Sequence, residues 1–370
     1  MIRITRRDLY HLRRVFGKAL GIDRRNHQDI VAWPCPDGYL IGTTRGEVAV
    51  AYTLHCEEAG APVVLPWRLV CDMAGRSNSP LAITSEDGKT IVTPEESGKT
   101  ATKVYYPRSK PEDVALPPGA NAEYENPPEL IRALADAAQV VDQTSMRYAL
   151  NHIQINPRRG EVTATDGRHA LVQSGYHLPG DTPYLIPTSG IWCYAELRQD
   201  EKVRMSLADE HLVIDIGPWT IALRLQKGRY PNVPEIIPGA EAADTVLSIS
   251  EQDIMPIRQF QSRMPPKAYS PVTIELDDDV SIYAGGNDDS FHEYIAHNSC
   301  YSGPPVSIAC QRRHLDLAMK FGLPEIRIED GSRAVLCVGE NRRYAWMPLS
   351  DTERIAPARM NEENTKSRET

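Results

Sequence analysis

Hydrophobic and polar residues follow one pattern three times along the 370-residue chain. In each copy a short apolar run typical of a buried strand leads directly into a helical pattern, and these runs begin at residues 63, 184 and 306. The helical patterns after them cover residues 67–75, 188–197 and 311–321. A spacing of about 120 residues, found twice, predicts three copies of one structural unit.

Alternating apolar and polar positions follow each of these helices and predict antiparallel strands. The first copy has residues 81–84 and 90–92 on either side of an Asp-Gly turn at residues 86–89, and the third copy has the same arrangement around residues 329–332. Residues 203–225 of the second copy alternate in the same way. Because Asp-Gly between apolar runs favours a hairpin, each copy is predicted to pack a helix on an antiparallel meander.

Each copy also opens with a helical pattern. Asp8 is predicted to cap the first of these helices, the pair Pro127-Pro128 precedes the second, and Ser250 is predicted to cap the third. These starts again lie about 120 residues apart, as a threefold repeat requires.

The predicted fold class is therefore α+β, with three repeated domains that each pack two helices on antiparallel sheet. Proline-rich and small-residue linkers place the domains at residues 1–124, 125–242 and 243–350. Residues 351–370 contain few apolar side chains, so they are predicted to form a disordered tail.

Charge is distributed unevenly, although the whole chain carries a formal net charge of -9. Arg13, Arg14 and Lys18 lie in the first helix, whereas acidic residues gather in strand turns. A protein that is acidic overall can still present a positive surface to phosphates. The alternative is that these cations are ordinary solvated helix faces.

Composition excludes several classes of protein. No run approaches the roughly 20 apolar residues of a membrane helix, and the N-terminus lacks a signal-peptide pattern. The seven cysteines are scattered and form no C-x-x-C motif, which argues against a disulfide framework or a zinc ribbon. A cytoplasmic protein without metal or cofactor is expected.

Candidate catalytic groups are few. Gly98-Lys99-Thr100 lacks the upstream glycine of a phosphate-binding loop, and residues 277–279 read as a hairpin tip rather than a calcium loop. His152, Asp166 and His169 are the one set that resembles an acid–base or metal site, without a nucleophile in a suitable context. We therefore expect a binding protein rather than an enzyme, with a hydrolase or metal enzyme that uses these three residues as the weaker alternative.

Four motifs resemble, in order and spacing, those of the beta subunit of bacterial DNA polymerase III, the sliding clamp. They are Met-Arg-Tyr-Ala-Leu-Asn at 146–151, Ala-Thr-Asp-Gly-Arg-His-Ala-Leu at 164–171, Gly-Arg-Tyr-Pro-Asn at 228–232 and Tyr-Ala-Trp-Met-Pro-Leu at 344–349. The resemblance extends over nearly the whole chain to Leu349 and is weakest in the first copy. It identifies the chain as a divergent member of that family.

The resemblance implies a DNA clamp fold, in which three domains form a half-ring and a head-to-tail homodimer encircles duplex DNA. Its implied partners are double-stranded DNA, the polymerase catalytic subunit and the clamp loader. Arg24, Arg25, Arg147 and Tyr148 would lie toward the DNA. A clamp-like peptide-binding protein that no longer encircles DNA is the alternative.

The family's second site is a pocket that receives short peptides from its partners. Carried over position by position, it comprises Leu150, Thr165, Gly167, Arg168, His169, Ala170, Pro231, Ile236, Met347, Pro348 and Leu349. Arg168 precedes His169 where the family has the reverse order, and Ala170 replaces a larger apolar residue, so a shallower pocket is expected. The residues after Leu349 could occlude the pocket or bind elsewhere. The competing interpretation makes Leu150, Ile236 and Met347 ordinary core.

Overall fold

The structure is a computed structural model that describes residues 1–56, 59–95, 103–118, 124–142, 144, 149–194, 197, 202–265, 270–285 and 290–355. Its contacts divide the chain into two compact units. The first unit contains Met1–Gln139, Met146–Val162 and Tyr176–Arg229, and the second contains Val140–Ser145, Thr163–Gly175 and Tyr230–Thr370. The predicted boundaries at residues 124 and 242 mark repeats of secondary structure, which this division into two units does not test.

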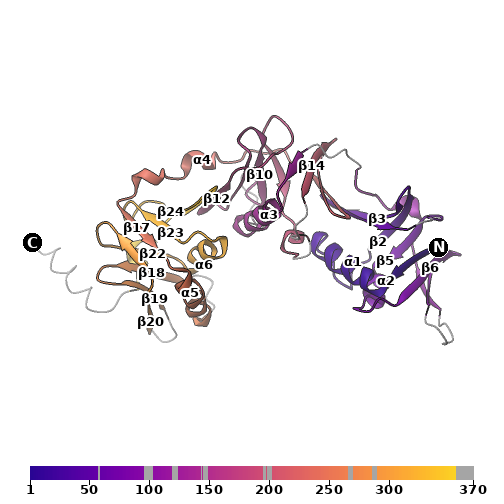
Figure 1. Cartoon of the computed structure of the whole chain (residues 1–370), viewed down its shortest axis with the longest axis horizontal. Helices are drawn as coiled ribbons and strands as arrows, with labels where there is room; N and C mark the ends of the chain where they lie inside the picture. The colour runs from indigo at the N-terminus through magenta and orange to yellow at the C-terminus, as the bar shows by residue number, and fades with distance from the viewer. Residues whose placement is uncertain are drawn as a thin grey trace, which may run out of the picture. The chain divides into compact units, whose positions relative to one another are not determined.

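The element order repeats three times, as predicted. The α-helices are α1 (Arg6–Ala19), α2 (Trp67–Met73), α3 (Glu129–Val140), α4 (Val233–Ile236), α5 (Glu251–Arg263) and α6 (Arg312–Phe321). Each copy runs from a strand to a helix, then through strands to a second helical segment and three further strands. Helices α1 and α2 contact each other in the first unit, and α5 and α6 do so in the second (Figure 1).

The second helical segment of the middle copy differs from the prediction. Where an α-helix was expected over residues 188–197, the described part forms a 3-10 helix at Gly190–Cys193, with Ser189 as its N-cap. A Cβ on Gly190 would lie 3.1 Å from the backbone oxygen of Lys18, and the Ser189 hydroxyl donates to the Ala19 oxygen at 3.3 Å. Close contact with the end of α1 therefore favours this tight turn.

The start of α1 also differs by three residues from the prediction. Thr5 is the N-cap, and Asp8 occupies the third helical position, where its carboxylate accepts from the backbone N–H of Thr5. The two residues form a capping box, which satisfies donors that a helix start leaves without partners. Ser250 caps α5 as predicted and accepts from the N–H of Gln252.

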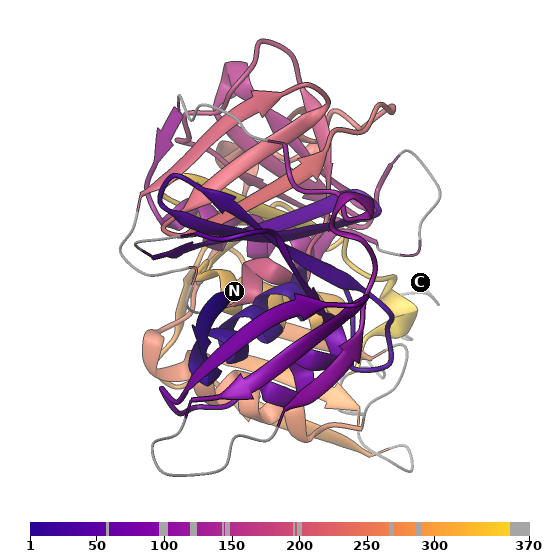
Figure 2. The same ribbon diagram turned by 90° about the vertical axis from the view of Figure 1, so that its right-hand side faces the viewer.

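Two antiparallel sheets and one strand pair make up the β-structure of the first unit. The four-stranded sheet has the order β1-β6-β7-β8 and the eight-stranded sheet the order β5-β2-β3-β4-β16-β15-β14-β9, while β10 pairs with β13. Figure 2 turns the strands of the first copy toward the viewer. The bounds are β1 (Ile2–Thr5), β2 (Asp29–Cys35), β3 (Gly38–Arg45), β4 (Val48–His55), β5 (Val63–Pro66), β6 (Pro80–Glu86), β7 (Lys89–Pro94), β8 (Val104–Pro107), β9 (Tyr124–Asn126), β10 (His152–Asn156), β13 (Tyr184–Pro187), β14 (Val203–Ala208), β15 (His211–Ile216) and β16 (Trp219–Arg224).

The second unit contains a sheet segment with the order β12-β25-β24-β23-β17-β21 and a separate sheet with the order β20-β19-β18-β22. Its strands are β12 (His169–Gln173), β17 (Thr245–Ser248), β18 (Pro271–Leu276), β19 (Val280–Gly285), β20 (Phe291–Ile295), β21 (Cys300–Ser302), β22 (Val306–Gln311), β23 (Glu325–Ile328), β24 (Val335–Gly339) and β25 (Arg342–Trp346). Strand β11 (Glu161–Thr165) includes residues of both units.

Equivalent strands connect successive copies. In the first unit β4 of the first copy pairs with β16 of the second, and the Tyr52 and Trp219 rings lie 4.7 Å apart at this junction. In the second unit β12 of the second copy pairs with β25 of the third, with His169 opposite Trp346. Both junctions are antiparallel and continuous with the sheets on either side, so backbone hydrogen bonds carry the connection between copies.

Residues 351–355, which were expected to belong to a disordered tail, are ordered. Asp351–Glu353 form a short 3-10 helix, and the backbone N–H of Ile355 donates to the Thr273 hydroxyl at 2.7 Å. The prediction from residue 351 onward was therefore wrong for residues 351–355, because a polar segment gains order from partners on a neighbouring sheet. Residues 356–370 lie outside the described part.

In the described ranges of the chain, no helix combines the length and the apolar character needed to cross a membrane.

Asp253 ties the start of α5 to the loop after β20. Its carboxylate accepts from the Tyr294 hydroxyl at 3.1 Å, the Asn298 amide groups at 3.0 and 3.2 Å, and the Ser299 hydroxyl at 2.7 Å. We predict that Asp253→Ala lowers the free energy of unfolding by about 3 kcal/mol, because it leaves several donors without an acceptor. Urea unfolding followed by circular dichroism measures the change.

Glu251→Ala in the same first turn is the matched control, since Glu251 is exposed. Loss of its charge near the helix N-terminus should cost only a few tenths of a kcal/mol. Equal effects of the two substitutions would show that the buried network contributes nothing.

Candidate functional site

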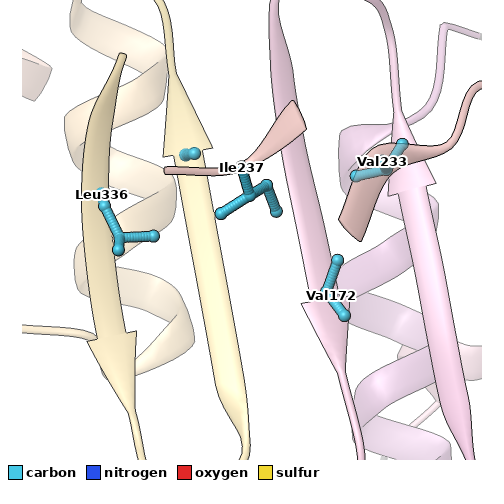
Figure 3. Packing of buried hydrophobic residues seen from close by; sticks show 5 residues of the cluster. Val172, Val233, Ile237 and Leu336 are labelled. Carbon is cyan, nitrogen blue, oxygen red and sulfur yellow. The ribbon is translucent and has the colours of Figure 1, made fainter. Parts of the chain in front are cut away.

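A small apolar cluster holds the α4 segment on the sheet of the second unit. Its buried members come from β12, the α4 segment, β24 and β25, and they are Val172, Val233, Ile237, Leu336 and Ala345. Figure 3 shows the α4 segment crossing the strands, with Ile237 between Leu336 and Val172. The cluster fixes a segment that would otherwise be a surface loop, since burial of apolar side chains is its main attachment.

Two large apolar side chains of the predicted pocket lie next to buried positions yet remain exposed. Ile236 is 69% exposed beside the buried Ile237, and Met347 is 51% exposed directly after the buried Trp346. The interpretation of these two residues as ordinary core is therefore wrong. Leu150 is buried, as that interpretation expects, and it belongs to the first unit.

The loop between β11 and β12 has a tightly defined conformation. The Thr165 hydroxyl donates to the His169 oxygen at 2.7 Å and accepts from the N–H of Gly167 at 3.0 Å. Asp166 accepts from the backbone N–H groups of Arg168 and His169 at 2.8 and 3.0 Å. Gly167 has a φ of 88°, a left-handed conformation that favours glycine. As a result the Arg168 side chain is exposed at the surface.

Further contacts join this loop to the other predicted pocket segments. The N–H of Met347 donates to the Arg168 oxygen at 3.1 Å, and the Tyr230 hydroxyl accepts from the N–H of Thr165 at 3.1 Å. Ala170 packs on the apolar cluster below α4 and is the register partner of Ala345. The structure thus brings the segments around residues 165–170, 230–237 and 345–349 together within the second unit.

His169 differs from the expectation that it lines the pocket. Its side chain is fully buried, with Nδ1 2.8 Å from the Tyr344 hydroxyl and Nε2 3.1 Å from Asp166 Oδ2. The His314 ring of α6 lies 4.7 Å from it, centroid to centroid. The buried His169 side chain therefore stabilises the loop, and Arg168 is the polar residue that the loop exposes.

Burial and hydrogen bonding shift the pKa values of this buried network. Burial alone raises the pKa of Asp166, but its hydrogen bond with His169 and the surrounding backbone N–H groups outweigh this effect and bring the pKa to about 2. Burial, reinforced by the neighbouring His169, lowers the pKa of His314 to about 3. At physiological pH Asp166 is therefore ionised and His314 is neutral.

The three residues weighed for catalysis are divided between the two units. His152 lies 2.6 Å from Asn151 Oδ1 and 3.9 Å from Glu47 in the first unit, whereas Asp166 and the buried His169 interact in the second. Among the residues that the structure describes, no group of three or more His, Cys, Asp or Glu side chains is placed to hold a metal ion.

A basic surface lies on α1 and α2 of the first unit. A hollow of about 470 Å³ is lined by Arg13, Arg14, Gly17, Lys18, Ile22, Asp23, Arg24, Trp67 and Cys71. Arg14 stacks over the Tyr10 and Tyr194 rings at 5.6 and 5.2 Å, which fixes its guanidinium group. The contribution of Tyr194 could not be found from the sequence, because it comes from the next copy of the repeat.

The residues predicted to face DNA are only partly described. Arg24 is exposed and forms an ion pair with Asp72 at 2.7 Å, while Arg25 is exposed on the same loop. Arg147 and Tyr148 lie outside the described residues. Arg13 and Lys18 are exposed on the neighbouring helix face and extend the same positive surface.

The third copy is less basic than its sequence suggests. Arg258 and Lys320 both pair with Asp316, at 2.9 and 2.6 Å, so one carboxylate offsets part of their charge. Arg312 donates to the backbone oxygens of Gln261 and Met264 near the end of α5. These cations stabilise the packing of the helices. Because their charges are partly offset, the positive field of the third copy is weaker than its number of Arg and Lys residues implies.

Comparison with known proteins identifies the fold as that of a sliding clamp. No family model and no curated protein matches the sequence. Solved structures do match: the DNA polymerase III subunit beta from Pseudomonas aeruginosa has a TM-score of 0.75 at 18% identity, over 94% of this chain and 99% of that chain. A putative DNA polymerase III beta subunit from Eubacterium rectale has a TM-score of 0.74 at 11% identity, with the same coverage.

A third match is a P. aeruginosa sliding clamp described as bound to griselimycin, with a TM-score of 0.74 at 17% identity over 94% of this chain and 99% of that chain. The predicted fold class, helices packed on antiparallel sheets in the clamp fold, is confirmed.

The Asp166 carboxylate should make stability depend on pH. Its folded pKa of about 2 lies below the usual 3.8, so its contribution is fully present above about pH 4 and is lost as the pH falls toward 2. The contribution is on the order of 2 kcal/mol. We predict that Asp166→Asn removes this part of the slope in urea unfolding measured between pH 5 and pH 2.

Asp37→Asn is the control, because Asp37 is exposed. It should leave the pH dependence close to that of the unmodified chain. If Asp166→Asn and the unmodified chain lose stability in parallel on acidification, the ionised Asp166 does not stabilise the loop.

Proposed function

We propose that this protein is a DNA sliding clamp without enzymatic activity, in which two copies of the chain form a ring around duplex DNA. The observation that carries the proposal is the way equivalent strands connect the copies of the repeat. β4 pairs with β16, and β12 pairs with β25. In the repeated element order, β20 of the third copy corresponds to β4 and β12, and β8 of the first copy corresponds to β16 and β25. Both β20 and β8 are edge strands of their own sheets.

A second copy of the chain can satisfy both edges at once. Unpaired edge strands present rows of free N–H and C=O groups that favour pairing with another chain. β8 exposes Tyr105 and β20 exposes Phe291, which are large apolar side chains suited to an interface core. When β20 of each chain pairs with β8 of the other, the two chains form a head-to-tail homodimer in which both of these edges are paired.

The basic surface on α1 and α2 suits contact with the phosphate backbone. Arg13, Lys18, Arg24 and Arg25 carry exposed guanidinium or ammonium groups there. A ring retains DNA by enclosing it, so these contacts need only be weak and independent of base sequence. Arg147 and Tyr148 are proposed to add to this surface.

The second-unit site around Arg168, Ile236 and Met347 suits a short peptide. Exposed apolar side chains beside a rigid loop that presents the exposed Arg168 match the composition of peptide-binding pockets. We propose that it binds the polymerase catalytic subunit and the clamp loader in the cytoplasm, and that griselimycin binds there too. Gly167, Ala170, Pro231, Pro348 and Leu349 would form the remaining wall, with Thr165 beside it.

One observation favours a second candidate function. Because Asp316 and backbone oxygens engage several cations of the third copy, the positive field toward DNA is weaker than expected. A clamp-like protein that binds peptides without encircling DNA would have this property. The two functions differ in topology and can be separated directly.

The separating experiment uses nicked circular plasmid. After incubation with the clamp loader of the same organism, an encircling clamp stays on the circle during gel filtration and leaves when a restriction enzyme linearises the DNA. A protein that binds DNA only from one side is retained equally on both forms. No retention on either form would favour the peptide-binding alternative.

The interface prediction concerns β20. Phe291→Glu places a charge on the exposed side of β20 in the proposed junction, so we expect the dimer dissociation constant to rise at least about 100-fold, as loss of an aromatic anchor buried by the partner implies. Light scattering after size exclusion measures the change. Leu207→Glu is the control, because Leu207 is also an exposed apolar residue but lies on β14, away from both edges.

The charge prediction concerns α1. Arg13→Glu with Lys18→Glu should shorten the lifetime of the loaded clamp on circular DNA and reduce the salt dependence of DNA binding, because two phosphate contacts are lost. Arg158→Glu with Arg159→Glu is the control, since these exposed cations lie on a turn after β10. Equal behaviour of the two double variants would contradict a role for α1 in DNA contact.

A further inference from the structure

The six residues after the predicted pocket, Ser350–Ile355, form a strap that lies on the sheet of β18 and β22. Ser350 and Glu353 make a capping box around the short 3-10 helix, with the Ser350 N–H donating to Glu353 Oε2 at 3.1 Å. The Arg354 N–H donates to the Asp351 oxygen at 3.2 Å. The strap therefore has its own local order.

The residue before the strap and the last residue of the strap are hydrogen-bonded to one point of the sheet. The Leu349 N–H donates to the Ala309 oxygen of β22 at 2.7 Å, and the Ile355 N–H donates to the Thr273 hydroxyl of β18 at 2.7 Å. Thr273 and Ala309 are direct register partners. The chain thus leaves the sheet and returns to it at the same place, which closes a small loop over β22.

Arg354 is the third attachment of the strap. Its guanidinium group pairs with Asp351 at 2.8 Å and lies so close to Gly331 that a Cβ there would be 3.0 Å from Nη2. Its charge also acts on Glu275, a buried residue of β18 whose Oε2 makes no hydrogen bond among the described residues. Burial and the nearby Asp277 and Glu293 raise the pKa of Glu275, and the charge of Arg354 opposes this shift.

The strap continues directly from the exposed pocket residues. Met347 is half exposed, and its backbone is held by the Arg168 oxygen on one side. Two residues later, directly before the strap, the Leu349 N–H is hydrogen-bonded to the Ala309 oxygen. Removal of the strap would turn Leu349 into a chain end, and chain ends lose order unless something attaches them.

We propose that the strap Ser350–Ile355 positions Met347, Pro348 and Leu349 for peptide binding, with Arg354 as its positioning residue. A wall that is ordered before binding loses less conformational entropy when the peptide arrives. The same attachment holds Ile355 on β18, so the strap supports the pocket wall and does not occlude it. The inference rests on the proposed peptide pocket.

Two truncations test the proposal. One ends the chain after Leu349 and removes the strap, and the other ends it after Ile355 and keeps it as the matched control. Hydrogen–deuterium exchange of the peptide that covers residues 345–349 should be at least tenfold faster in the first variant and unchanged in the second. Equal protection in both truncations would overturn the proposal, whatever the pocket binds.

Affinity for fluorescently labelled griselimycin gives the functional readout. The full chain and the variant ending at Ile355 should bind equally, and the variant ending at Leu349 about tenfold more weakly. Failure of the full chain to bind would count against the proposed pocket and leave the exchange result to decide the strap. Tighter binding by either truncation would mean that the removed residues block the pocket, which contradicts the proposal.

Point substitutions guard against a truncation that fails to fold. Arg354→Ala should weaken griselimycin binding about threefold and speed exchange at residues 345–349, and Arg354→Lys should restore part of both by returning the charge beside Glu275. Arg333→Ala is the control, because Arg333 forms exposed ion pairs with Glu329 and Asp330 on the neighbouring hairpin. Identical results for Arg354→Ala and Arg333→Ala would exclude a positioning role.

Discussion

Backbone hydrogen bonding between strands of successive copies is the constraint on which this structure depends. A strand of each copy pairs with a strand of the next copy. In the first unit β4 pairs with β16, and in the second unit β12 pairs with β25. Aromatic pairs such as Tyr52 with Trp219 add packing to these junctions. In the part of the chain that the structure describes, the equivalent strands β8 and β20 are edge strands of their sheets, and the proposed ring would pair them.

The candidate peptide site depends on a different set of interactions. A buried network of Asp166, His169 and Tyr344 fixes the loop that presents Arg168, and an apolar cluster around Ile237 fixes the segment that presents Ile236. The exposed groups are few, while the residues that hold them are buried. This division is common where binding requires a rigid surface, because the supporting contacts reduce the entropy lost on binding.

The sequence predicted the repeated element order and most of the helices, because periodic burial and local caps such as Ser250 are encoded within a few residues. It did not predict features that depend on distant contacts. The turn at Gly190 depends on α1, the burial of His169 depends on Tyr344 and His314, and the order of the strap depends on Thr273. For the same reason the sequence could not show that Asp316 pairs with two cations of the third copy.

The central claim is that two copies of the chain complete each other's open edges. Sedimentation equilibrium of the unmodified protein at micromolar concentration tests it most directly, since each chain has a mass of 41.3 kDa. The account predicts a single species of twice that mass with little dissociation on dilution. A stable species with the mass of one chain would contradict it.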